Sequence, residues 1–205
     1  MSKKYYYQPP EPEPQLNFIT RYPYKVIRFF KYMSTEQKII SGIALLTLVI
    51  LFGGIWLLMK SEERSNRPLM GGEIPNQGAS HVARGQEHPA YNSNPPTSGW
   101  HWGDGTAGPG IKDQPVPDEL VLHSMEHGAA VVWYKDDLPA GDVEKIKAAF
   151  NDASGKKIML PRKNLDVPVA LTSWNWLLKL KTIDKVKIKE FIETNNDRAP
   201  EKAPI

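Results

Sequence analysis

The chain has 205 residues, of which 40% are hydrophobic and 24% charged, and its net charge is +3. This length leaves room for one compact domain with appended segments, and the composition excludes a wholly disordered protein. The chain has no cysteine, so disulfides, thiolate metal sites and cysteine nucleophiles are excluded.

The positive charge is concentrated near the N-terminus. Residues 1–38 hold seven lysines or arginines against three acidic residues, whereas residues 60–205 are close to neutral. Binding to nucleic acid requires clustered cations that displace counterions from phosphates. We therefore expect no nucleic-acid partner.

Residues 1–33 are predicted to be a cytoplasmic tail. The first fifteen residues are rich in proline and lack apolar periodicity, which is typical of disorder. In "RYPYKVIRFFKYM", residues 21–33, cations alternate with aromatic residues, as in a juxtamembrane segment that lies against anionic lipid. A simple orientation signal for membrane insertion explains the same pattern.

Residues 34–59 are predicted to form a transmembrane helix. Ile39–Met59 has no charged residue, and as a helix it rises about 31 Å, which matches the hydrocarbon core of a bilayer. "STEQ" at 34–37 fits a helix-starting capping box. A cleaved signal peptide has a shorter apolar region after a short basic start, whereas here 38 residues come first.

Cations near the span set its expected orientation. Five precede it and three follow, which places the N-terminus in the cytoplasm. The sequence thus predicts a single-pass protein of the plasma membrane, whose partner is the lipid bilayer and whose C-terminal domain is periplasmic or extracellular.

Residues 60–80 read as a polar linker, and residues 81–201 as the extracytoplasmic domain. Its first part, 81–118, is rich in proline and glycine and predicts a loop-rich lobe. Strands are expected at 129–134, 156–162 and 167–174, and helices at 142–155 and 184–195. The fold class is therefore α+β: a small single domain with a loop-rich N-terminal lobe, a short mixed sheet and two helices, preceded by one transmembrane helix.

The stretch "HSMEH", His123 to His127, has three interpretations. As a helix it spells H-x-x-E-H, a zinc-peptidase motif in which Glu126 activates metal-bound water. As a strand it separates the two histidines by about 13 Å. Because Gly128 and a strand-like run follow at once, we expect a bend that leads into a strand rather than a zinc helix.

A metal site without peptidase activity is the favoured hypothesis. Its predicted ligands are His101, His123 and His127, with Met125 and Glu126 as further donors. The metal would be copper or zinc, and a thioether favours copper. No catalytic residue is assigned.

Two alternatives remain open. The histidines have structural roles in a non-catalytic interaction or assembly module with a membrane-protein partner, or the domain is a metallopeptidase with Glu126 as its base. The proline-rich loop at 91–99 is interpreted as a rigid wall that supports the histidines.

Four short motifs together resemble the bacterial domain-of-unknown-function family numbered 3105. They are "YNSNPPTSGWHW" at 91–102, "HSMEHGAAVVWY" at 123–134, "VALTSWNW" at 169–176 and "FIETNNDRAPE" at 191–201. The resemblance implies a membrane anchor followed by this domain outside the cytoplasm, and no established reaction. Its signature includes His101, His123, Glu126 and His127, whereas Trp100 and Met125 depart from the common pattern.

Overall fold

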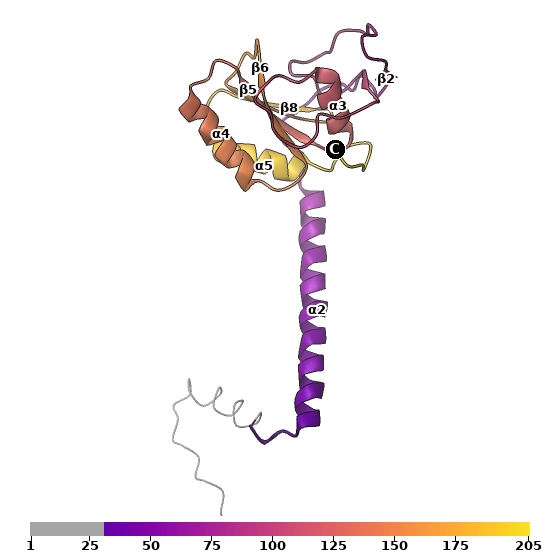
Figure 1. The fold of residues 1–205 in the computed structure, drawn as a ribbon, viewed down its shortest axis with the longest axis vertical. Coiled ribbons are helices and arrows are strands. Elements are labelled where there is room, and N and C mark those ends of the chain that lie inside the picture. Colours follow the sequence, from indigo (N-terminus) through magenta and orange to yellow (C-terminus); the bar gives the residue numbers. More distant parts are fainter. Residues whose placement is uncertain (1–30) are drawn as a thin grey trace, which may run out of the picture. The chain divides into compact units, whose positions relative to one another are not determined.

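The computed structural model describes residues 31–205, so the tail predicted over residues 1–33 lies almost wholly outside the described residues. The chain divides into two compact units, with the boundary between Ser61 and Glu62. Figure 1 shows the helices and strands of the fold.

Helix α2 (Thr35–Asn66) contains the predicted transmembrane helix. The expected capping box is confirmed, because the Ser34 hydroxyl accepts from the Gln37 N–H at 3.2 Å and the Gln37 side chain accepts from the Ser34 N–H at 3.0 Å. Over residues 31–205 this is the one helix long and apolar enough to cross a membrane, and an 18-residue window within Thr35–Glu63 has a mean hydropathy of 2.5. A membrane anchor and a signal sequence both have this property.

The second unit is built on a mixed six-stranded sheet with the order β1-β8-β7-β5-β6-β4. Strand β5 lies at its centre, parallel to β6 and antiparallel to β7. The α+β class with a mixed sheet is confirmed. The strands are β1 (Gly72–Glu73), β4 (Gly110–Ile111), β5 (Ala130–Lys135), β6 (Lys157–Arg162), β7 (Val169–Ser173) and β8 (Trp176–Leu180).

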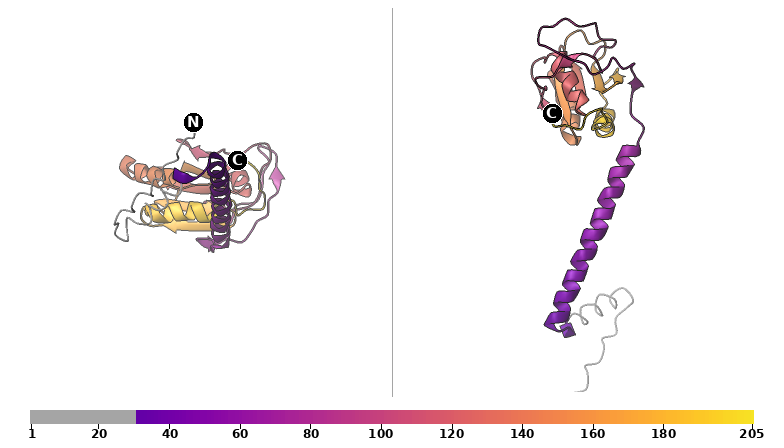
Figure 2. Two further views of the ribbon diagram at one scale, coloured as in Figure 1. Left: turned by 90° about the horizontal axis from the view of Figure 1, so that it is seen from below. Right: turned by 90° about the vertical axis from the view of Figure 1, so that its right-hand side faces the viewer.

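Helices cover both faces of this sheet. Because side chains alternate along a strand, Val132 and Tyr134 of β5 pack in one core with α4 (Ala140–Asp152) and α5 (Lys185–Asn195). Val131 and Trp133 pack in the other core, with α3 (Asp118–Glu126). Figure 2 shows α3 and α5 on opposite sides of the strands.

The expected bend at 123–127 is wrong, because residues 123–126 form the last turn of α3. Gly128 has φ +95° and ends the helix without disturbing it. Its N–H donates to Met125 O at 2.9 Å, and the Ala129 N–H donates to Ser124 O at 2.9 Å, the two hydrogen bonds of a Schellman motif. The glycine is thus a C-terminal stop that comes directly after the motif.

The expected linker also differs from the structure. Helix α2 continues to Asn66, and β1 pairs antiparallel with β8 in the main sheet. The Asn195 side chain accepts from the Met70 N–H and donates to the Met70 carbonyl, both at 3.0 Å. Part of the segment 60–80 is therefore built into the folded unit.

Candidate metal centre

The end of helix α3 presents three metal-ligating side chains on one face. His123, Glu126 and His127 are spaced i, i+3 and i+4, which brings side chains together on a helix surface. His127 is the C-cap residue, and its N–H still donates to His123 O at 3.1 Å, so the helical spacing is kept to the end of the motif.

A second pair of histidines comes from the small parallel sheet of β2 (His81–Val82) and β3 (His101–Trp102). His81 and His101 are direct partners in its register, and their ring centroids are 4.8 Å apart. Gly103 makes room for this pairing, because a Cβ there would lie 2.9 Å from the His81 ring. The loop-rich lobe thus contributes two imidazoles.

All four imidazoles gather near Glu126. One ligand atom each from His81, His101 and Glu126 lie within 4.8 Å of one another, and the same holds for His123, Glu126 and His127. The His123 ring centroid lies 5.3 Å from those of His81 and His101, and 4.5 Å from that of His127. The cluster is largely shielded from solvent, although the His81 side chain is half-exposed.

Backbone carbonyls fix the tautomers of three rings. The Nδ1 atoms of His101, His123 and His127 lie 2.7–2.8 Å from carbonyl oxygens, those of Gly99, Gly105 and Pro204 respectively. Because a carbonyl oxygen only accepts, each Nδ1 carries the proton. The Nε2 of each neutral ring then has a free lone pair, which is the form that binds metal.

The contact between His101 and Glu126 requires a cation. His101 Nε2 lies 2.9 Å from Glu126 Oε2, and both side chains are buried. A neutral His101 protonated at Nδ1 would face an ionised carboxylate with two lone pairs in opposition. A proton or a metal ion shared between the two atoms resolves this conflict.

The C-terminal segment, residues 197–204, closes the cluster on the side of His127. The Pro204 carbonyl accepts a hydrogen bond from His127 Nδ1, and the Glu201 carboxylate lies 3.3 Å from His127 Nε2. The Glu201 N–H also donates to the Glu126 carbonyl at 3.1 Å. Glu201 is therefore a candidate ligand that lies outside the H-x-x-E-H motif.

Met125 is the one predicted donor that the structure places elsewhere. It is fully buried in the core between α3 and the sheet, where its sulfur accepts from the Thr172 hydroxyl at 3.2 Å. On a helix Met125 shares a face with Leu122 and turns away from Glu126. The Met125 thioether is therefore not a ligand that would favour copper at this cluster.

His81 belongs to the cluster, although the sequence did not single it out as a ligand. The fifth histidine, His88, lies apart: its Nε2 is 3.4 Å from Glu119 Oε1, and its ring stacks on Trp100 with centroids 6.1 Å apart. Nothing in the sequence separates these two histidines, because both stand in the same loop-rich lobe.

The loop at 91–99 has the supporting role expected of it. Asn94 accepts from Arg162 Nε at 2.7 Å, and Arg162 in turn forms two hydrogen bonds with the Asp118 carboxylate on α3. Thr97 and Ser98 are fully buried, and the Ser98 hydroxyl accepts from the Gln77 N–H. The loop therefore fixes the start of β3, and with it His101, against α3.

Stability of the metal-free protein should fall as the pH drops below about 6.5. Burial lowers the pKa of His123 from its ordinary value of 6.5; the neighbouring histidines act in the same direction, and the hydrogen bond to Gly105 opposes them. Below 6.5 the unfolded chain binds a proton that the folded chain does not, so the free energy of unfolding decreases, by up to about 1.4 kcal/mol per pH unit. Urea unfolding at several pH values would measure this slope. His123→Asn should flatten it, and equal slopes for the two proteins would contradict the assignment.

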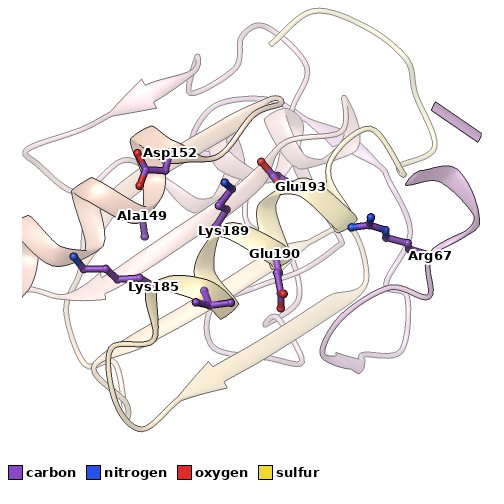
Figure 3. A pocket seen from close by; sticks show the side chains of 8 residues that line it. Arg67, Ala149, Asp152, Lys185, Lys189, Glu190 and Glu193 are labelled. Carbon is purple, nitrogen blue, oxygen red and sulfur yellow. The ribbon is translucent and has the colours of Figure 1, made fainter. Parts of the chain in front are cut away.

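A separate cavity of about 470 Å³ lies on the other face of the sheet, between α4 and α5. Figure 3 shows its charged lining, which includes Arg67, Lys189 and Glu193. None of the clustered histidines lines it. This cavity is therefore not the entrance to the histidine cluster.

Comparison with known proteins identifies one family. The family model described as "Protein of unknown function (DUF3105)" matches residues 81–204, which is more than half of the chain. No curated protein and no solved structure gives a significant match. The matched region contains all four clustered histidines and Glu126.

Proposed function

This chain belongs to the DUF3105 family, and we propose that its domain binds a transition-metal ion through the clustered histidines and Glu126. The observation that supports this most directly is the buried 2.9 Å contact between His101 Nε2 and Glu126 Oε2. The Nδ1 atom of His101 already donates its proton to the Gly99 carbonyl. Three fixed tautomers with available Nε2 lone pairs add to it. Imidazole nitrogen with carboxylate oxygen suits zinc and copper(II), and these are the metals we propose.

We propose that α2 anchors this domain to the plasma membrane, with the N-terminus in the cytoplasm. The length and hydropathy of Thr35–Glu63 and the excess of cations before the span support this arrangement. Protease added to intact cells, after removal of any outer membrane, should then degrade the domain. Degradation only after lysis would indicate the opposite orientation, with the domain in the cytoplasm.

A metallopeptidase is the second candidate, because H-x-x-E-H does lie on a helix. In that function His123 and His127 bind zinc and Glu126 acts as the general base. Against it, Glu126 is 3% exposed, and its Oε2 is within 3.5 Å of two imidazoles. A general base must instead face the water that attacks the substrate.

Metal titration of the full chain in detergent tests the proposed function. Metal-free protein is titrated with Zn²⁺ and with Cu²⁺, and bound metal is measured after removal of the excess. We expect at least one tightly bound ion per chain, weaker binding in His123→Ala and unchanged binding in His88→Ala. Absence of saturable binding would remove the proposal.

A further inference from the structure

The donors of the cluster fall into two groups that share one residue. Glu126 stands with His81 and His101 from the β2–β3 pair, and also with His123 and His127 from its own helix. The two pairs of imidazoles come from separate parts of the fold, the β2–β3 pair and the end of α3. A carboxylate has two oxygens, so it can bind one ion with each.

The number of donors exceeds what one tetrahedral ion takes. Four imidazoles and a carboxylate make five donors, whereas structural zinc is bound by four, and ligands about 2.0–2.1 Å from one ion lie within about 3.5 Å of each other. In each group of three the donor atoms lie within 4.8 Å of one another, so each group is a candidate for one ion. Two ions divide these five donors into two sets of three protein ligands that share Glu126.

A second carboxylate is needed near the cluster to balance the positive charge of a second ion. Glu201 Oε2 lies 3.3 Å from His127 Nε2 and so supplies that charge to the half formed by His123 and His127. Its N–H is held by the Glu126 carbonyl at 3.1 Å, which keeps Glu201 next to the cluster. In the other half, the half-exposed His81 leaves access for a water ligand.

We infer that the domain holds a two-metal centre in which Glu126 bridges two transition-metal ions. One ion is bound by His81 and His101, and the other by His123 and His127 with Glu201. This inference rests on the proposed function and makes it more specific. Two-metal sites with ions about 3.5–4 Å apart occur in hydrolytic and phosphoryl-transfer enzymes.

Stoichiometry distinguishes this inference from the proposed function. The full chain in detergent is loaded with excess Zn²⁺, freed of loose metal, and analysed for zinc per chain. Two ions per chain support the two-metal centre, one ion overturns it while the proposed function stands, and no ion overturns both. If His88→Ala lowers the count from two to one, the second ion lies at His88, which also overturns the inference.

The bridging role of Glu126 is tested with Co²⁺, and the ligands of one half are tested with the substitution His81→Ala. Two Co²⁺ ions bridged by Glu126 should be magnetically coupled, and an uncoupled spectrum at two ions per chain would overturn the bridge. His81→Ala should lower the zinc count from two to one because it removes a ligand of one half only. A count of two in this variant would contradict the assignment of His81.

Discussion

The Glu126→Gln variant is expected to keep the fold of the metal-free protein and to lose metal affinity by about 100-fold. Glutamine has the shape of glutamate, and its amide N–H can donate to the His101 Nε2 lone pair across the 2.9 Å contact. A neutral amide is a poor ligand, and even the loss of an outer-shell partner costs about 10–100-fold in affinity. Calorimetric titration with Zn²⁺ measures the affinity, and urea unfolding with chelator present measures the stability.

His101→Ala is a less informative change at the same contact. It leaves the buried Glu126 carboxylate without its closest partner, and breaking a buried pair in this way costs about 3–5 kcal/mol. Loss of metal binding in that variant would then reflect unfolding as well as a missing ligand. The glutamine substitution separates these two effects, since it removes the charge and keeps a hydrogen-bond partner.

Glu119→Gln is the matched control. Glu119 lies on the same helix and also faces a histidine, with Oε1 3.4 Å from His88 Nε2, but it stands outside the cluster. Its substitution should leave metal affinity unchanged. Wild-type affinity in Glu126→Gln would mean that Glu126 is not a ligand, and the additional loss of peptide hydrolysis there would favour the metallopeptidase.

The central strands and the two helices of one core were predictable because burial imposes a period on the sequence. In 184–195 the apolar residues Ile188, Phe191 and Ile192 recur at helical spacing, and all three are fully buried. Asp184 also gives a local start signal, since its carboxylate accepts from the N–H groups of Val186 and Lys187. These signals act within a few residues, so a sequence displays them directly.

Helix α3 was missed because its apolar face is short and its stop signal was interpreted as a break. Val121, Leu122 and Met125 are fully buried and share a face, which is a helical pattern of little more than one turn. Recognising that face would have placed Met125 in the core and the three ligating residues together on another side. Gly128 was interpreted as a residue that disfavours a helix. It lies just after the C-cap, where the chain adopts a positive φ that favours glycine.

The membership of His81 depends on contacts that no local pattern displays. It meets His101 through a pairing of two strands of two residues each, twenty positions apart in the chain. The tautomers of the cluster depend likewise on backbone carbonyls at Gly99, Gly105 and Pro204, and a carbonyl is present at every residue whatever its type. The histidines were therefore visible in the sequence, but their convergence was not.

The Gly128→Ala variant is expected to lower the free energy of unfolding by about 2–5 kcal/mol. An alanine at φ +95° is itself unfavourable by about 1–2 kcal/mol. The new Cβ would also lie 2.9 Å from the Asp197 Cα, and crowding of this kind adds about 1–3 kcal/mol. Urea unfolding of the full chain measures the change.

Gly78→Ala separates the two contributions. Gly78 has a similar φ of +88°, but a Cβ there meets nothing within 4 Å, so only the backbone cost of about 1–2 kcal/mol should remain. Gly128→Ala should in addition weaken Zn²⁺ binding, because Asp197 begins the segment that holds Glu201 and Pro204 against His127. Equal destabilisation in the two variants, with unchanged zinc affinity in Gly128→Ala, would show that the C-terminal segment shifts without cost and does not support the metal centre.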